Sequence, residues 1–163
     1  SEGPRNEAYL YYAAMTRATR NADIGLFTKP SNREARMEAK THLAIDAELC
    51  GHLEELRTQY CRLRMITTDR MAADARGLVH GGFIFGMADY AAMLAVNDPH
   101  VVLGAADSRF LKPVRTGESV VAEAQVESVD GKKQMVTARV SRDQEVVYQG
   151  TFTCFVLERH VLD

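Results

Sequence analysis

The sequence predicts an α+β fold in which a curled antiparallel sheet of about five to six strands wraps around one long central helix, with an N-terminal helical extension. Three observations indicate this architecture: one long apolar segment of helix-forming composition, several segments in which apolar and polar residues alternate, and short turn signals between those segments. One strand precedes the apolar helix and the others follow it, which suggests that the sheet curls around it.

The first 40 residues predict the helical extension. Residues 6–20 carry apolar side chains at helical spacing. After a proline break, Ser31 is a plausible N-cap of a second helix, and Glu34 completes a capping box with it. The predicted division is therefore a helical extension over 1–40 and a main domain over 41–163.

Alternating segments predict the strands of the main domain. Residues 120–127 alternate between apolar and polar side chains, which marks a strand with one buried face. The pair Asp130-Gly131 predicts a hairpin, and residues 142–145 predict a second turn. The predicted strands cover residues 60–68, 101–111, 120–127, 136–141 and 146–156, whereas residues 50–58 fit either a strand or a short helix. The side chains expected to face inward from the last strand are Val146, Tyr148, Phe152, Cys154 and Val156.

The central helix is predicted over residues 82–97, a segment too long for a strand and rich in Ala, Met and Leu. It is apolar nearly all round, which indicates burial on most sides. Asp89 interrupts it, and an ionised carboxylate without partners is costly to bury. Asp89 is therefore either the working carboxylate of an active site or a structural group that pairs across an interface or with a neighbouring backbone. Gly82 and Gly86 share its helix face and leave room for a ligand or for close packing against another chain.

The entrance of this helix is rich in glycine. Gly81 and Gly82 stand where the first N–H groups lack intrahelical acceptors and where the helix dipole favours negative charge. Such N–H groups can polarise a carbonyl oxygen and stabilise an oxyanion, although a plain glycine turn explains the same residues. His80 precedes the pair and either positions the site or takes part in acid–base chemistry.

Composition excludes several other classes of function. The net charge of −2 gives no reason to expect nucleic acid or an anionic membrane as a partner, and the longest apolar stretch is too short to span a bilayer. We expect no secretory leader, and three cysteines without a close pair indicate reduced thiols in a cytoplasmic protein. We expect no metal site, because the other histidines are scattered as His42, His52, His100 and His160.

The run HGGFIFGMAD over residues 80–89 resembles the HGG-x-x-F-x-x-A-D signature of hot-dog-fold thioesterases of the phenylacetate-pathway (PaaI) type. The resemblance covers roughly residues 42–158 and includes a later strand–turn feature, Phe110 to Val114 followed by Gly117-Glu118. The hot-dog fold that it implies agrees with the architecture predicted above.

The resemblance implies an acyl-CoA thioesterase that needs no cofactor. Asp89 would activate water or attack the thioester itself, and Gly82 would donate an N–H to the thioester carbonyl, with Gly81 or His80 alongside. Family members are homodimers or homotetramers with the active site at the subunit interface. Asp74 stands where many relatives have an Asn that orients water or substrate, and an ionised Asp there accepts hydrogen bonds but donates none.

Two further questions stay open at this point. Lys112 and Arg115 follow the strand at 101–111, where cations could meet the phosphates of coenzyme A, although a solvated strand end also explains them. The alternative function is a non-catalytic acyl-CoA-binding sensor domain of the same fold, which would not need a carboxylate at position 89. A hot-dog dehydratase or hydratase is a third possibility, but its motif is not found.

Overall fold

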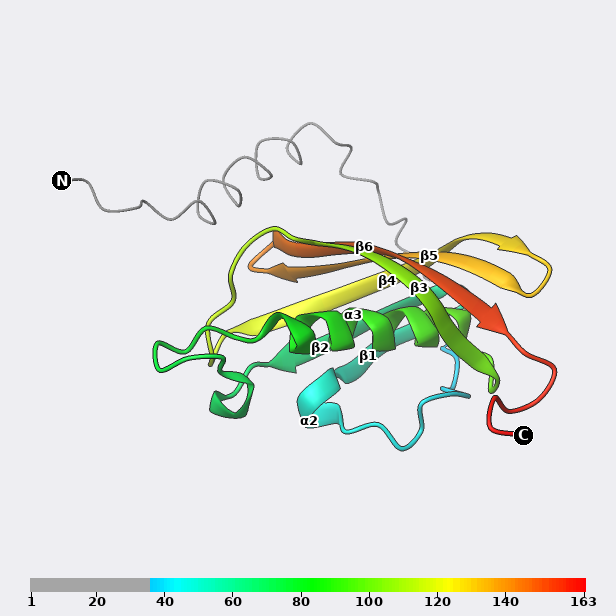
Figure 1. Cartoon of the computed structure of the whole chain (residues 1–163), viewed down its shortest axis with the longest axis horizontal. Coiled ribbons are helices and arrows are strands. Elements are labelled where there is room, and N and C mark those ends of the chain that lie inside the picture. Colours follow the sequence, from blue (N-terminus) through cyan, green and yellow to red (C-terminus); the bar gives the residue numbers. More distant parts are fainter. Residues whose placement is uncertain (1–35) are drawn as a thin grey trace.

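In the computed structural model, which describes residues 36–163, a six-stranded sheet curves around the long helix α3 (Figure 1). The strand order is β1-β2-β4-β5-β6-β3, and every neighbouring pair is antiparallel. The elements are α2 (Ala47–Cys50), β1 (His52–Arg57), β2 (Tyr60–Ile66), the short 3-10 helix η1 (Asp69–Met71), α3 (Gly81–Val96), β3 (Val101–Phe110), β4 (Ser119–Asp130), β5 (Lys133–Arg142) and β6 (Glu145–Val156). The predicted α+β hot-dog architecture is confirmed.

The segment over residues 50–58, which was ambiguous in the sequence, resolves in the structure. The segment that fitted either a strand or a short helix contains the end of α2 and all of β1, with Gly51 between them at a φ of 109°. Of the helical extension predicted over 1–40, residues 36–40 are not helical, and the remainder of that prediction lies outside the described residues.

The two predicted hairpins are present, and Tyr148, Phe152 and Cys154 are buried as predicted, but the inward position of Val146 was predicted wrongly. A bulge in the β5–β6 pairing places Ser141 opposite Val146 and Val140 opposite Tyr148. The extra residue, Val147, is buried, whereas Val146 is only half-buried. An inserted residue reverses the inside–outside alternation on one side of the bulge, so the period of two did not continue through it.

The core lies between α3 and the concave face of the sheet, because α3 packs against all six strands. Most of α3 is buried, and its buried side chains are Ile84, Met87, Ala88, Tyr90, Ala91, Ala92, Met93, Leu94 and Ala95. The helix ends at Asn97, whose left-handed φ of 53° turns the chain towards β3. No helix among the described residues is long and apolar enough to cross a membrane.

Strand β3 forms one edge of the sheet, where it pairs with β6 alone. It crosses α3 in Figure 1, and its middle residues Gly104, Ala105 and Ala106 are exposed. The start of β3 and the middle of α3 therefore lie close together, and Asp89 stands between them.

Candidate active site

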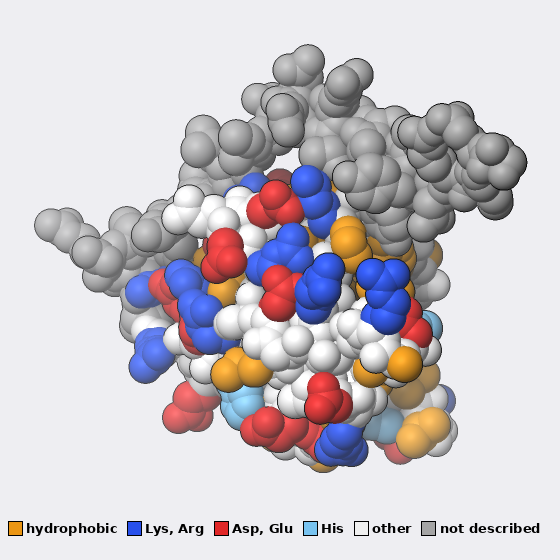
Figure 2. All heavy atoms as spheres, turned by 90° about the vertical axis from the view of Figure 1, so that its left-hand side faces the viewer, with side chains coloured by type: hydrophobic (Ala, Val, Ile, Leu, Met, Phe, Trp, Pro, Cys, Tyr) orange, Lys and Arg blue, Asp and Glu red, His pale blue; other side chains and the backbone are white. Residues whose placement is uncertain are grey.

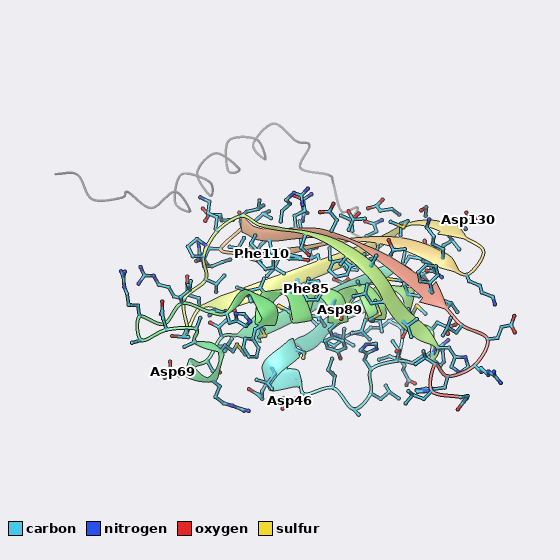
Figure 3. The ribbon with its side chains drawn as sticks, viewed as in Figure 1. Asp46, Asp69, Phe85, Asp89, Phe110 and Asp130 are labelled. Atoms are coloured by element: carbon cyan, nitrogen blue, oxygen red, sulfur yellow. The ribbon has the colours of Figure 1, made fainter. Side chains whose placement is uncertain are left out.

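Asp89 lies in the middle of α3 (Figure 3) and is half-buried. Its Oδ1 atom is buried and has no hydrogen-bond partner among residues 36–163. Burial raises the pKa of this carboxyl from 3.8 to about 6. A structural partner inside the subunit, one of the two explanations left open by the sequence, is therefore absent from the described part of the chain. The carboxylate is desolvated without compensation, as is typical of groups that react or bind.

Asp89 opens into a pocket of about 570 Å³ beside α3. Apolar side chains from α3, the start of β3 and the C-terminal segment make up much of its wall, together with polar groups from residues 40–42. The lining residues are Lys40, Thr41, His42, Leu43, Asp89, Met93, Pro99, His100, Val101, Val102, Leu103, His160 and Val161. A mixed wall of this kind can hold an organic acyl group next to a reactive carboxylate.

Three of the histidines that are scattered in the sequence meet at this pocket: His42, His100 and His160. Residues 36–163 contain no group of three His, Cys, Asp or Glu side chains that could hold a metal ion. The sequence raised these histidines only as possible metal ligands, and their place in one pocket was not predicted. No local signal could have found them, because three segments far apart in the chain supply them.

The helix entrance is built as the sequence predicted, but the two glycines have different surroundings. A Cβ on Gly81 would lie 3.1 Å from the ring of Phe110, so the absence of a side chain allows close packing there. Gly82 is exposed, and its added Cβ would meet only the ring of His80, at 3.0 Å from Nε2. His80 is the N-cap of α3, is exposed, and makes no side-chain capping bond. Gly82 is thus the more open of the two positions, whereas Gly81 is packed against Phe110.

The helix entrance does not line the Asp89 pocket. Asp89 follows Gly82 by seven positions, which places the two residues on one face but about 10 Å apart along the helix axis. Gly86 lies between them, and a Cβ there would meet no atom within 4 Å. One thioester carbonyl cannot touch both Gly82 and Asp89 of the same chain, so this open helix face has room for a second contributor.

Asp74 does not line the Asp89 pocket, and its carboxylate is engaged in its own loop. Its Oδ1 accepts hydrogen bonds from the backbone N–H groups of Arg76, at 2.9 Å, and Leu78, at 3.1 Å. In this chain the Asp74 side chain orders the loop that leads into α3.

Lys112 and Arg115 differ in whether an acidic side chain neutralises them. The Lys112 ammonium lies 3.6 Å from Glu145, which neutralises it. The guanidinium of Arg115 has no ion-pair partner in the described part of the chain, and Arg115 pairs with Leu78 beside the loop that leads into α3. Figure 2 shows this end of the molecule, where basic side chains are mixed with acidic ones. Arg115 is the better placed of the two cations to meet an anion near the helix entrance.

Two proteins of assigned function are similar in sequence. Methylthioribose-1-phosphate isomerase of Aquifex aeolicus is 43% identical over 123 residues, which cover 75% of this chain but 27% of that protein. Transcription factor FapR of Caldanaerobacter subterraneus is 26% identical over 124 residues, which cover 76% of this chain and 62% of that protein. The chain thus spans about a quarter of the first relative and about three fifths of the second, so neither name transfers to it.

Solved structures share the fold over nearly their whole length. An uncharacterized protein from Pyrococcus horikoshii is 49% identical, with a TM-score of 0.78 over 79% of this chain and 99% of that one. The PaaI protein of Escherichia coli, from the phenylacetic acid degradation operon, is 22% identical, with a TM-score of 0.63 over 69% of this chain and 83% of that one. At that identity the PaaI likeness concerns the fold alone.

The family model described as the thioesterase superfamily matches residues 76–149. This range contains the loop of Asp74 from Arg76 onward, the helix entrance, all of α3 and strands β3 to β5. Together with the fold and the HGG-to-Asp89 signature, the match establishes that the chain belongs to the thioesterase superfamily and has the hot-dog fold of its PaaI-type members.

Proposed function

We propose that the protein is an acyl-CoA thioesterase, which hydrolyses an acyl thioester to a carboxylic acid and coenzyme A in the cytoplasm. The observation that carries this proposal is the carboxylate of Asp89, which has a buried oxygen without a hydrogen-bond partner among residues 36–163 and faces a pocket of about 570 Å³. A packed core gains nothing from such a group, since an unsatisfied buried acceptor loses the free energy of its hydration. Membership of the thioesterase superfamily supports the same chemistry.

Asp89 acts as the general base or as the nucleophile. With a pKa of about 6, the carboxyl is mostly ionised at neutral pH and is a stronger base than an ordinary aspartate. As a base it takes a proton from water while the water oxygen attacks the thioester carbon, and the C–S bond then breaks. As a nucleophile its own oxygen attacks the same carbon, the C–S bond breaks with release of the thiolate, and water hydrolyses the resulting anhydride.

The oxyanion that develops on the thioester carbonyl is stabilised by the N–H of Gly82 from a second copy of the chain. The axial separation of about 10 Å within one chain excludes Gly82 and Asp89 of a single subunit from acting on one carbonyl. Two α3 helices that pack in opposite directions would bring the Gly82 of one copy to the Asp89 of the other. The open face at Gly86 leaves space for that approach.

Strand β3 supports the homodimer that this arrangement requires, or a homotetramer built from it. It offers ten residues of edge backbone with small exposed side chains in its middle. The opposite edge strand, β1, is partly covered, because the backbone N–H of Met37 donates to Leu56 at 3.0 Å. An edge strand that residues 36–163 leave uncovered can pair with another strand, so β3 is the edge that a second copy would extend.

Coenzyme A is held at the helix entrance in this proposal, with Arg115 as the main candidate for its phosphates. A guanidinium recognises phosphate through paired N–H groups, and that of Arg115 is exposed beside the entrance loop. Lys112 contributes less, because Glu145 already neutralises it.

The second candidate, a non-catalytic acyl-CoA sensor, is favoured by the likeness to transcription factor FapR. A screen of acyl-CoA thioesters with a thiol-detecting reagent, run beside a calorimetric binding titration, separates the two functions. Hydrolysis of at least one thioester, with turnover, supports the enzyme. Tight binding of a thioester without release of thiol would establish the sensor instead.

A further inference from the structure

His42 is fixed in the Asp89 pocket by a clamp at the end of α3. The side-chain amide of Asn97, which is 8% exposed, accepts a hydrogen bond from the backbone N–H of Lys40 at 2.8 Å and donates one to the carbonyl of Glu38 at 2.9 Å. Thr41 follows and is 7% exposed. The segment that carries His42 is therefore anchored to the same helix that carries Asp89.

The imidazole of His42 is also fixed in orientation. Its backbone is left-handed, with a φ of 55°, a region in which histidine is found more often than most residues with a Cβ. Its Nδ1 lies 2.8 Å from Thr41 Oγ1, and its ring stacks on Tyr90 with the centroids 6.0 Å apart. Tyr90 is the next residue after Asp89. The remaining ring nitrogen, Nε2, has no partner among residues 36–163.

We propose that Nε2 of His42 accepts a hydrogen bond from the water molecule that Asp89 activates, which makes His42 a second catalytic residue. This inference rests on the proposed thioesterase function. In this arrangement Nδ1–H donates to Thr41 Oγ1, and Nε2 is left with its lone pair. Water then gives one hydrogen to His42 and the other to Asp89, and a lone pair of its oxygen points to the thioester carbon.

The proposed step is balanced without any further reactant. As the water oxygen bonds to the carbonyl carbon, its proton passes to the carboxylate of Asp89. The C–S bond breaks with its electrons going to sulfur, and the thiolate of coenzyme A takes the proton back from Asp89. The water's other proton is lost from the product acid to solvent, and His42 orients the water without gaining or losing a proton.

Burial supports this role because it lowers the pKa of His42 below 6.5 and so keeps the ring neutral at neutral pH. The ionisable groups around the ring are Asp89 and Tyr90 from α3, Lys40 from its own segment, and His100 and His160 from the opposite wall. Turnover then requires an unprotonated His42 as well as an ionised Asp89. At pH values below both pKa values, the logarithm of kcat/KM should therefore fall by about two for each unit of pH, because two groups must lose a proton.

Two substitutions separate the chemical role of His42 from its role in the backbone. His42→Asn suits the left-handed backbone and reproduces the position of Nδ1, whereas His42→Gln suits that backbone less well but reproduces the position of Nε2. We expect kcat to fall on the order of 100-fold in His42→Asn and clearly less in His42→Gln, with little change in KM, because a misplaced reactant loses about that factor. In both variants the slope of log kcat/KM against pH on the acid side should fall from about two to about one.

The control is His52→Gln, an exposed histidine outside the pocket that pairs with Glu48, and it should behave as the wild type. Turnover in His42→Asn equal to or above that in His42→Gln would overturn the proposal, because a purely conformational role favours Asn. A slope of log kcat/KM against pH that stays at about two in His42→Gln would also overturn the proposal. Absence of thioester hydrolysis by the wild-type protein overturns the proposed function and this inference together, whereas an active wild type with an equally active His42→Asn variant overturns only the inference.

Discussion

Replacing Asp89 by Asn tests the proposed function most directly. The amide has nearly the volume and shape of the carboxylate, but it is not a base and does not ionise. General-base assistance contributes about 100- to 10,000-fold to a rate, so hydrolysis of acyl-CoA should fall by that factor while the thioester still binds. The same substitution should leave the fold intact and raise its stability at neutral pH.

The gain in stability follows from the pKa of Asp89. The folded-state pKa of about 6 lies about two units above the usual 3.8, and each unit corresponds to about 1.36 kcal/mol. Because the pKa is raised, the folded state favours the protonated acid: the stabilising effect is complete below pH 3.8 and is lost as the pH rises through about 6. At pH 7 the ionised carboxylate therefore costs at most about 3 kcal/mol, less because the side chain is only half-buried.

Asp89→Asn removes this penalty, so its Tm should exceed that of the wild type at pH 7 by a few degrees, and by at most about 10 °C. The Tm difference should shrink as the pH is lowered towards 4. Thermal melts over this pH range and thiol-release kinetics on the same samples measure both effects, and Asp69→Asn, which changes an exposed carboxylate on η1, is the matched control. A lower Tm combined with unchanged hydrolysis per folded molecule would show that Asp89 is a structural partner and would refute the argument.

The remaining predictions concern pH, the helix entrance and assembly. Turnover should rise with pH through about 6 as Asp89 ionises, and a pH profile without a group near that value would argue against a catalytic Asp89. Gly82→Val should lower kcat on the order of 100-fold by crowding the approach to the N–H donor, and unchanged kinetics in the folded variant would place the oxyanion elsewhere. Sedimentation velocity should show a dimer or larger at micromolar concentration, and a monomer there would contradict the shared site.

The sequence was sufficient to predict the elements whose pattern is local. Residues 82–97 are apolar and rich in helix formers, and α3 occupies Gly81–Val96. The alternation that predicted strands is equally local, since side chains of successive strand residues point to opposite faces. It was wrong at Val146 and Val147, because a bulge depends on how β5 and β6 pair and not on the sequence of β6 alone.

Asp89 could be singled out in the sequence for a related reason, whereas the pocket beside it could not be predicted. Asp89 stands out because it is a charged residue inside an apolar helix, which is a local contrast. Its pocket is assembled from segments that begin at residues 40, 99 and 160, and no sequence window contains more than one of them. The partner of Lys112 was missed in the same way, because the turn between β5 and β6 brings Glu145 to it.

The energetic position of Asp89 also bears on the choice between enzyme and sensor. Even after it is reduced for the partial exposure of the side chain, a penalty of at most about 3 kcal/mol is a noticeable part of a folding free energy of about 5–15 kcal/mol. A binding site can hold a neutral thioester with an amide of the same shape and avoid that penalty. A general base cannot avoid that penalty. The desolvation that destabilises its ionised form also raises its pKa towards the working pH and so makes it a stronger base. A buried carboxylate oxygen that has no partner in the described part of the chain is thus expected of a catalyst and has no use in a sensor. The turnover of Asp89→Asn is therefore the measurement on which the two functions differ most.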